Sequence, residues 1–563
     1  MERGRGQWWF DPARRWRGGR RELIWRGPHG PQEGDYCVAE VPDEGPAFLI
    51  EILGAEDRPE WDDASVISQH RLRHRFPPAV EQEVARATAP GSRERAGRLD
   101  LRDQLVFTID PEDARDHDDA LSIETLEKDR VRVGIHIADV SHYVKPGSAL
   151  DREARLRGTS TYLPGGVVPM LPHSLSSDLC SLRPDQDRLT LSVIVVLDGA
   201  GGVHDVRFAE TVIRSRHRLN YGEVQEHFDG HRRFDAALEQ ALSGLRATAR
   251  ALRARRRTLG ALELEIPEVK AWVDAQGDVI RLERRMHLES HELIEEFMLL
   301  ANRCVGAEGA RRTAGVLYRV HEPPSPLKLT ELDVVLKTLG LPRMGAVHDP
   351  ARALQALLAV PLDRAHRGLL HRIVLRSLAR ARYLERDLGH FGLAASAYCH
   401  FTSPIRRYPD LHNHARVREW IRDQRSAAWD PVENAALAAQ CTGCEQIATD
   451  AEREAVKVKG LRWLEGRLGH TGSGIITGLI PAGLFVELDE VPVEGFVRVS
   501  REIDDHFTLD ATGVRLVGRR TRRRFALGDT IKVTVARVDV PARECDFALA
   551  VTPSAMRRRH RRG

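Results

Sequence analysis

The alternation of apolar and polar positions separates β-rich from helical stretches along the chain. Apolar residues alternate with polar or small ones over 131–137, which predicts a half-buried strand. The continuous apolar run 189–197 predicts a core strand, and 203–213 predicts another. Leu and Ala recur at spacings of three and four over 231–258, and a helix also fits 287–305. The centre of the chain should therefore mix strands and helices.

Short β-rich regions flank this centre. Strand-like pieces at 7–10, 36–41 and 47–50 are separated by turns that contain Gly and Pro, which predicts a small β domain. Beyond about residue 463, short strands punctuated by Gly predict a small closed barrel of the OB type. The predicted fold class is a multidomain α+β chain, with a central mixed α/β domain flanked by small OB-type β-barrels.

The predicted divisions follow these changes in pattern. Residues 350–390 and 415–460 are expected to be helical. The divisions are an N-terminal cold-shock or OB-like domain (1–78), a central domain (79–425) that begins with a connector (79–104), a helical connector (426–462), a C-terminal OB-type domain (463–552) and a basic tail (553–563).

Acidic charge is concentrated in ten residues between two apolar runs. Six of the ten are acidic, namely Asp110, Glu112, Asp113, Asp116, Asp118 and Asp119. Crowded carboxylates raise one another's pKa, and a divalent cation relieves the repulsion. Oxygen ligands favour Mg²⁺ or Mn²⁺ over zinc, and two such ions can hold both reacting oxygens of a phosphodiester in line. A solvated acidic turn or a calcium loop is the alternative, but the flanking runs and the spacing disfavour it.

A second motif follows around residue 405. Thr402 and Ser403 before Pro404 predict the capped start of a helix, whose free backbone N–H groups attract anions. Arg406 and Arg407 come directly after it, and guanidinium groups pair well with phosphate. Beside a metal-type acid cluster, this motif indicates a phosphate clamp.

Clusters of basic residues near both ends of the chain indicate binding to a nucleic acid. The net charge of +3 is small because 85 Lys and Arg nearly balance 82 Asp and Glu. Basic residues interleaved with aromatics suit a single-stranded nucleic acid, although the tryptophans are equally well explained as the core of a small barrel. The basic clusters are Arg14, Arg15, Arg17, Arg20 and Arg21 among Trp8, Trp9, Trp16 and Trp25, then Arg519–Arg524, and finally 557–562.

Cysteine use and hydropathy bear on the compartment. The seven Cys are scattered, and the pair Cys441 and Cys444 falls in a predicted helix, which favours buried thiols over a zinc site. Unpaired Cys suit a reducing compartment. No apolar run approaches the roughly 20 residues of a membrane span, and no signal peptide is recognisable. We expect a cytoplasmic protein without a membrane partner.

The chain resembles the ribonuclease II / ribonuclease R family of 3′-to-5′ exoribonucleases. The resemblance rests on the acidic loop, 162–182, 318–323 and 400–410, and the last ninety residues are similar to the family's S1-type RNA-binding barrel. It implies processive hydrolysis of single-stranded RNA to 5′-mononucleotides with two Mg²⁺ ions. DNA is not expected as a partner, and a monomer is expected.

The resemblance also assigns site residues. The metal ligands and catalytic carboxylates match Asp110, Asp116, Asp118 and Asp119, with Asp118 most important for turnover. The phosphate-binding arginine matches Arg406, and Arg407 is assigned to substrate binding. The other substrate residues are Tyr162, which stacks near the last nucleotide, Tyr221, a second aromatic contact further from the cut, and Glu295, which binds the terminal ribose, with Glu296 as the alternative register.

The chain departs from the family pattern in three places. Leu264 stands where the family usually has Phe, which predicts a weaker grip on the last nucleotides. His117 replaces an aromatic residue of the acidic loop, and the N-terminal region is short for paired cold-shock barrels.

Two alternative functions stay open. One is an RNA-binding protein of this fold without catalysis, and the other is a nuclease that acts on DNA or endonucleolytically.

Overall fold

The computed structural model describes the backbone of most of the chain. The described residues are 2–4, 7–10, 20–25, 30–32, 34–42, 44–55, 58–266, 268–312, 315–344, 348–422 and 430–550, with side chains from residue 20 onward except 364–365. The predicted basic residues Arg14, Arg15 and Arg17, with Trp16, and the tail 557–562 lie outside them, as do the side chains of Trp8 and Trp9.

The central sheet has the strand order β12-β9-β8-β7-β13-β6, and a further pairing of β12 with β13 makes it curl on itself. Its neighbours are antiparallel, except that β13 runs parallel to β7 and β6. The three strands predicted from the pattern are confirmed, and the third is longer than expected. The strands are β6 (Leu99–Asp100), β7 (Val106–Asp110), β8 (Asp119–Leu126), β9 (Arg130–Ala138), β12 (Asp187–Asp198) and β13 (Val203–Asn220).

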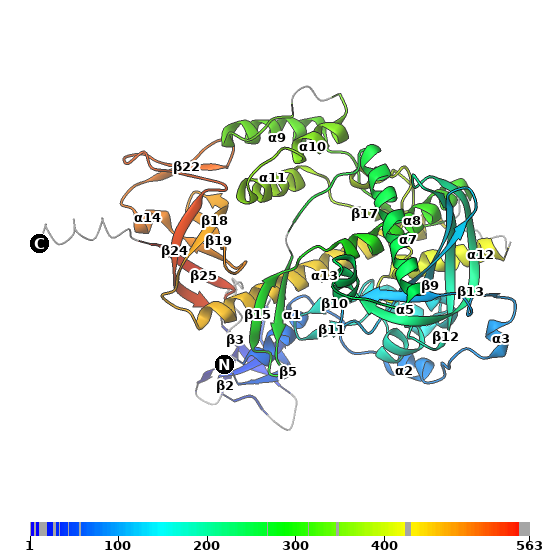
Figure 1. The fold of residues 1–563 in the computed structure, drawn as a ribbon. Helices are drawn as coiled ribbons and strands as arrows, with labels where there is room; N and C mark the ends of the chain where they lie inside the picture. The colour runs from blue at the N-terminus through cyan, green and yellow to red at the C-terminus, as the bar shows by residue number, and fades with distance from the viewer. Residues whose placement is uncertain are drawn as a thin grey trace, which may run out of the picture.

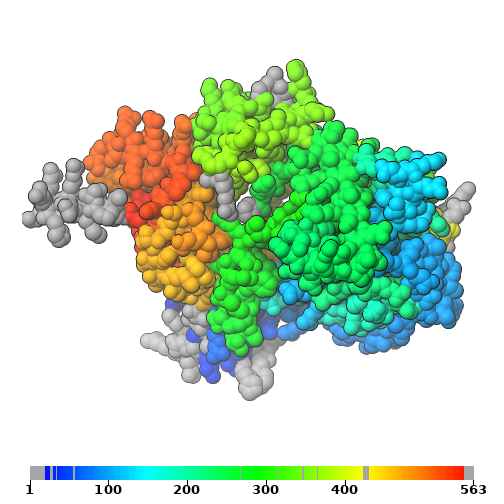
Figure 2. All heavy atoms as spheres, in the orientation of Figure 1, coloured from blue at the N-terminus to red at the C-terminus, as the bar shows by residue number. Residues whose placement is uncertain are grey.

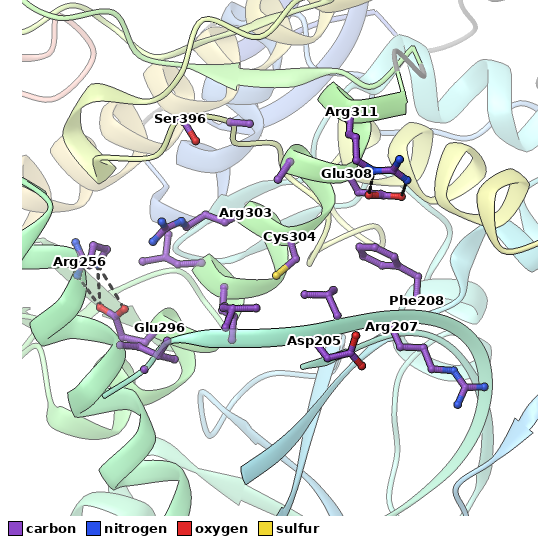
Figure 3. Close-up of a pocket in the computed structure, with 18 of the residues that line it drawn as sticks. Asp205, Arg207, Phe208, Arg256, Glu296, Arg303, Cys304, Glu308, Arg311 and Ser396 are labelled. Atoms are coloured by element: carbon purple, nitrogen blue, oxygen red, sulfur yellow. Dashed lines mark hydrogen bonds and ion pairs between the residues drawn. The ribbon is translucent and has the colours of Figure 1, made fainter. Parts of the chain in front are cut away.

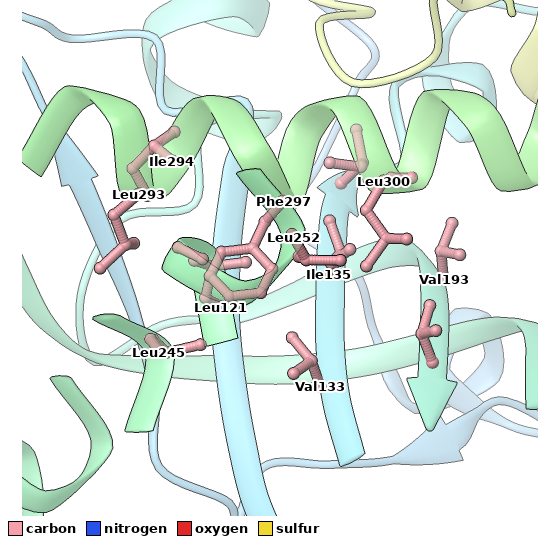
Figure 4. Close-up of a cluster of buried hydrophobic side chains, with 14 of the residues drawn as sticks. Leu121, Val133, Ile135, Val193, Leu245, Leu252, Leu293, Ile294, Phe297 and Leu300 are labelled. Atoms are coloured by element: carbon pink, nitrogen blue, oxygen red, sulfur yellow. The ribbon is translucent and has the colours of Figure 1, made fainter. Parts of the chain in front are cut away.

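Two long helices cover one face of this sheet (Figure 4). They are α7 (Ala236–Thr258) and α8 (Glu289–Arg312), which confirms both helix predictions. Phe297 of α8 is fully buried against the sheet with Leu121 and Ile135. Burying one such side chain stabilises the fold by about 1.5–3 kcal/mol. This packing fixes β7 and β8, and with them the acidic loop that joins the two strands.

Shorter elements surround the sheet. They are α2 (Pro78–Val84), α3 (Ser92–Arg95), α4 (Val140–Tyr143), α5 (Ala149–Arg157), β10 (Thr161–Leu163), β11 (Gly166–Val168), η2 (Leu175–Leu179), α6 (Tyr221–Phe228), β14 (Val269–Val273), β15 (Val279–Arg284), β16 (Tyr318–Val320), α9 (Pro326–Leu339), α10 (Pro350–Leu358), α11 (Arg364–Ser377), β17 (Arg382–Leu384), η3 (Phe391–Leu393) and α12 (Tyr408–Ile421).

Two helix predictions were too long. Residues 350–390 form α10 and α11 and then strand β17, because 382–384 pair with β16. Residues 415–460 are divided between α12 and α13 (Pro431–Glu465). The second helix starts anew because the Asp430 side chain accepts a hydrogen bond from the Val432 N–H and Pro431 follows the cap.

The N-terminal region forms a five-stranded sheet in the order β1-β2-β3-β5-β4. The predicted strands at 7–10, 36–41 and 47–50 are confirmed. The strands are β1 (Glu2–Gly4), β2 (Gln7–Phe10), β3 (Arg21–Ile24), β4 (Asp35–Glu40) and β5 (Ala47–Ala55), followed by η1 (Pro59–Trp61) and α1 (Asp62–Gln69).

The C-terminal region contains the predicted closed barrel, with strands in the order β18-β19-β20-β25-β24 (Figure 1). Gly483 opens β19 where a Cβ would lie 2.0 Å from the Val497 carbonyl oxygen, so only glycine fits. The elements are β18 (Thr471–Ile480), β19 (Gly483–Leu488), β20 (Glu494–Val497), α14 (Val499–Glu502), β21 (Phe507–Leu509), β22 (Arg515–Gly518), β23 (Arg524–Ala526), β24 (Thr530–Asp539) and β25 (Glu544–Leu549).

The long helix α13 connects these regions. It contacts β10 and β17 of the central domain, α1, and β24 of the barrel. The Lys459 ammonium is buried, and it donates to Asp62 and to the carbonyls of Pro59 and Gly277. In Figure 2 the segment of α9–α11 lies beside the C-terminal region, and Val514 and Leu527 of that region belong to its apolar cluster.

The prediction that 441–444 lie in a helix is confirmed. Cys441 is buried as expected, but Cys444 is only half-buried. Within the described ranges, no helix is both long enough and apolar enough to cross a membrane.

Candidate active site

The acidic loop joins the ends of β7 and β8, as predicted. Asp110 is the last residue of β7, and Asp119 is the first residue of β8. The 181–182 segment holds the loop between them, because the Ser181 hydroxyl accepts from the His117 N–H at 3.0 Å and the Leu182 N–H donates to the His117 carbonyl at 3.0 Å. The carboxylates therefore stand on a fixed loop rather than on a solvated turn.

Three of the four carboxylates contact a specific partner. Asp118 Oδ1 accepts from the Ile405 N–H at 2.9 Å, and its Oδ2 lies 3.5 Å from Arg406 Nε. Asp116 Oδ2 accepts from the hydroxyl of Tyr162 at 3.0 Å. Asp110 Oδ2 lies 2.8 Å from His117 Nδ1, at an angle that does not make a hydrogen bond.

The carboxyl groups disturb one another's ionisation. Burial raises the pKa of Asp118 well above its usual range, and the Asp116 and Asp119 charges raise it further, while Arg406 and the Ile405 N–H oppose them. Burial and the charge of Asp110 raise the pKa of Asp119 to about 8. Without a cation, the loop therefore retains protons at neutral pH.

The chemistry of the loop fits a hard cation, although its ligands are not preassembled. Asp110 Oδ2 and Asp118 Oδ2 are buried without a hydrogen-bond partner. Such oxygens suit a divalent ion of the Mg²⁺ type. Across the described part of the chain, however, no three His, Cys, Asp or Glu side chains are grouped so that they could hold an ion. Asp116 and Asp118 instead point to Tyr162 and Ile405.

The predicted helix start at Pro404 is wrong. Residues 404–406 form a turn in which the Arg406 and Arg407 N–H groups both reach the Ser403 carbonyl, and α12 begins only at Tyr408. Arg407 is extended, with φ −135° and ψ 124°, because it forms a β-bridge with Thr159. The turn thereby gives one backbone N–H, that of Ile405, to Asp118.

The two neighbouring arginines have different environments. The Arg406 side chain is 44% exposed and faces Asp118. The Arg407 guanidinium instead donates to Asp410 Oδ1 at 2.7 Å, and the same oxygen accepts from the Ser403 N–H at 2.8 Å. Arg407 thus holds the turn, and its placement does not match the substrate-binding role expected from the sequence.

Tyr162 stands on the β10–β11 hairpin with 43% of its surface exposed. Its hydroxyl is tied to Asp116, and its backbone N–H donates to Glu452 Oε1 of α13 at 2.8 Å. Burial raises the pKa of the Glu452 carboxyl. Sequence reasoning missed Glu452 because no local motif marks it, and only the fold brings α13 to the hairpin.

Tyr221 lies close enough to Glu295 and to Asp110 and Asp119 of the acidic loop for their charges to act on it. The Tyr221 ring stacks on His291, with centroids 4.0 Å apart and an interplanar angle of 19°. Burial raises the pKa of Tyr221, and the charges of Asp119, Asp110 and Glu295 add to the effect. Glu295 Oε1 accepts a hydrogen bond from His287 Nε2 at 2.9 Å, and this contact raises the pKa of His287. Sequence reasoning also missed both histidines. The available signal was that His287, His291 and Glu295 follow one another at intervals of four residues.

Two other positions considered in the sequence analysis, Glu296 and Leu264, contact residues outside the acidic loop. Glu296 is buried and pairs with Arg256 at 2.6 Å. This contact directs it away from Glu295 and so favours the Glu295 register. Leu264 packs against the apolar cluster of α9–α11, which includes Leu336 and Leu370.

Comparison with known proteins gives consistent matches. A family model of the RNB domain matches residues 98–423, and a model of the S1 RNA binding domain matches residues 467–549. Ribonuclease R of Thermotoga maritima is 37% identical over 544 residues, which cover 92% of this chain and 76% of that protein.

Two solved structures place the fold. Mycoplasma genitalium RNase R in complex with ribose-methylated single-stranded RNA matches with a TM-score of 0.86 at 26% identity, covering 94% of this chain and 85% of that one. Yeast Ssd1, a pseudonuclease, matches with a TM-score of 0.69 at 18% identity, covering 91% and 66%, and so shares the fold alone. Together with the extent of the Thermotoga match, these similarities show that the chain belongs to the ribonuclease R family of RNB-domain proteins.

Proposed function

We propose that the chain is a 3′-to-5′ exoribonuclease that degrades single-stranded RNA to 5′-mononucleotides. The observation that carries the proposal is the buried carboxylate of Asp118, placed among three further aspartates and faced by Arg406, in a chain 37% identical to a ribonuclease R. A related RNase R, from Mycoplasma genitalium, has been solved with single-stranded RNA.

The carboxylates of Asp110, Asp116, Asp118 and Asp119 are the proposed holders of the metal. Nucleases of this family generally depend on a metal ion. Oxygen-only ligands favour Mg²⁺, with Mn²⁺ as the second choice. When bound, such an ion lowers the pKa of a coordinated water and neutralises charge on the phosphate.

The remaining roles belong to side chains around the loop. The Ile405 N–H fixes the orientation of Asp118, and Arg406 is placed to stabilise negative charge that builds up on the scissile phosphate. Removing one such charge-stabilising donor typically lowers kcat by about 10²–10³-fold.

Substrate recognition is assigned to two aromatic residues and one carboxylate. The half-exposed ring of Tyr162 offers a stacking surface for a base. Glu295 is assigned to the terminal ribose, since a carboxylate accepts a hydrogen bond from the 2′-hydroxyl that distinguishes RNA from DNA. Tyr221 lies beside Asp119 and Asp110, which favours a contact at the terminal nucleotide rather than further along the strand.

The three-stranded sheet β21-β22-β23, which lies outside the closed barrel in the C-terminal region, supplies a basic surface for the rest of the RNA. Arg519–Arg524 are exposed at the turn between β22 and β23. Exposed guanidinium groups attract the phosphate backbone without regard to sequence.

The five-part domain division, the monomeric state and the cytoplasmic location stay predictions.

The rival function is an RNA-binding protein without catalysis, because yeast Ssd1 shows that the fold alone does not guarantee activity. The deciding experiment is the digestion of a 5′-labelled RNA with and without Mg²⁺. Asp118→Asn keeps the size of the side chain but removes its charge, so we expect no cleavage and nearly unchanged RNA affinity. Asp113→Asn in the same loop is the control, since Asp113 pairs with Lys270 instead. Wild-type cleavage by Asp118→Asn, or none by the unmodified chain, would reject the proposal.

A blocked 3′ end and a DNA of the same sequence test the other rival. Cleavage of a 3′-blocked RNA would indicate an endonuclease. Equal degradation of DNA and RNA would contradict the role given to Glu295.

A further inference from the structure

A cavity of about 870 Å³ is lined by the beginning of β13 (Figure 3), whereas the end of β13 pairs with Asp110 of the acidic loop. It is lined by the first residues of β13, the end of α7, the second half of α8 and the end of α12. From Phe208 in the cavity to Asn220, which pairs with Asp110 of the acidic loop, β13 advances about 40 Å at the rise of an extended strand. Helix α8 borders both sites, because Glu296 of the cavity lining directly follows Glu295. Arg256 holds Glu296 and His287 contacts Glu295, so the two carboxylates belong to different surroundings.

One side of the cavity carries excess positive charge. Arg255, Arg256 and Arg303 line it together with one carboxylate, Glu296, which Arg256 binds. Within the described residues, Arg303 has no hydrogen bond or ion pair. Burial lowers the pKa of Arg303, and the charges of Arg256 and Arg255 lower it further. An anion bound beside Arg303 would relieve this repulsion.

The other side of the cavity carries two aromatic rings beside the Glu308–Arg311 ion pair and Arg312, whose guanidinium lies 5.9 Å from the centre of the Trp420 ring. Phe208 and Trp420 meet edge to face, with ring centroids 6.2 Å apart at 78°. Leu252 and Leu300 extend the apolar lining. Such a surface accepts a flat ring by stacking and burial.

We propose that this cavity binds a nucleoside phosphate, with its phosphate at Arg303 and its base against Phe208 and Trp420. The volume lies in the usual range of small-ligand sites, about 300–1,000 Å³. An inorganic anion would make no contact with the rings of Phe208 and Trp420. An uncharged aromatic ligand would leave the positive charge of Arg303 without a counter-ion. The inference goes beyond the proposed nuclease activity and does not depend on it.

Photolabelling with 8-azidoadenosine 5′-monophosphate tests the site on the full chain. The reaction is run in EDTA, so that metal-dependent binding at the acidic loop does not contribute, and labelled peptides are identified by mass spectrometry. We expect label on the segment 203–208 or on the peptide that contains Trp420. Adenosine 5′-monophosphate should prevent labelling at concentrations at least about tenfold below those needed with adenosine or inorganic phosphate.

Matched variants separate the cavity from general charge effects. Arg303→Gln should weaken labelling about tenfold or more, because a charged hydrogen bond to phosphate is lost. Arg207→Gln is the control, since Arg207 lines the same cavity but points away from the other labelled side chains (Figure 3). Arg255→Gln, at an exposed position, replaces Arg303→Gln if the latter does not fold.

Label confined to 110–119, equal effects of Arg303→Gln and Arg207→Gln, or inorganic phosphate as effective as the nucleotide would each overturn the proposal. Because labelling is measured without RNA cleavage, its failure is distinguishable from failure of the nuclease assignment.

Discussion

The ionisation of Asp119 predicts an unusual dependence of stability on pH. Its pKa rises from 3.8 to about 8 on folding, so the folded chain holds a proton between these pH values that the unfolded chain has released. The free energy of unfolding must therefore fall as pH rises through this window. At about 1.4 kcal/mol per pH unit, the loss between pH 5 and pH 8 is about 4 kcal/mol.

This loss should be visible as a fall in Tm of about 8 °C for a domain of this size in EDTA, at about 2 °C per kcal/mol. Mg²⁺ should reverse the trend, because a cation replaces the proton and its affinity rises with pH up to about 8. Asp119→Asn should make the fall of the metal-free profile shallower, and the raised pKa of Asp118 should account for the slope that remains. Differential scanning calorimetry at pH 5, 6, 7 and 8 measures all three effects.

The exposed Asp113 of the same loop supplies the control, and Asp113→Asn should keep the wild-type slope. If the metal-free Tm of wild type and Asp119→Asn changed in parallel between pH 5 and pH 8, the crowded-carboxylate argument would be refuted. A Tm that rises with pH in EDTA would refute it as well.

Five further substitutions test single contacts. Tyr162→Ala should lengthen the limit product by several nucleotides on a sequencing gel, and an unchanged ladder would show that Tyr162 does not stack the terminal base. Arg406→Ala should lower kcat by about 10²–10³-fold with little change in Tm. Arg407→Met should instead cost about 3–5 kcal/mol of stability, because it leaves the buried Asp410 unpaired; the reverse pattern for the two arginines would contradict their assignment. Glu295→Gln should narrow the preference for RNA over DNA in a competition assay, whereas Glu296→Gln should leave that preference unchanged.

Local patterns predicted the framework of the site well. The apolar runs before Asp110 and after Asp119 predicted the buried strands β7 and β8. This worked because a buried strand is recognisable from a short run of consecutive apolar residues. The helix start at Pro404 failed because its capping signature is local, while the β-bridge between Thr159 and Arg407 is not.

Contacts between segments far apart in the chain could not be predicted from the local sequence. Arg406 and Arg407 have the same chemistry and adjacent positions, so only the buried Asp410 decides which guanidinium faces the loop. Glu452 is 290 residues from Tyr162, and nothing in its own neighbourhood indicates that contact. The choice of Glu295 over Glu296 likewise depends on Arg256, a partner 40 residues away from Glu296.

The helix α13 makes the geometry of the whole molecule sensitive to its own length. Its Glu452 side chain accepts a hydrogen bond from the Tyr162 N–H, and the helix also packs against β24 of the barrel. One extra residue between these contacts would rotate the barrel by about 100° around the helix axis and advance it by about 1.5 Å. In the proposed nuclease, RNA bound by the barrel would then approach the carboxylates from a different direction. The length of α13 therefore determines the angle at which the RNA enters the site.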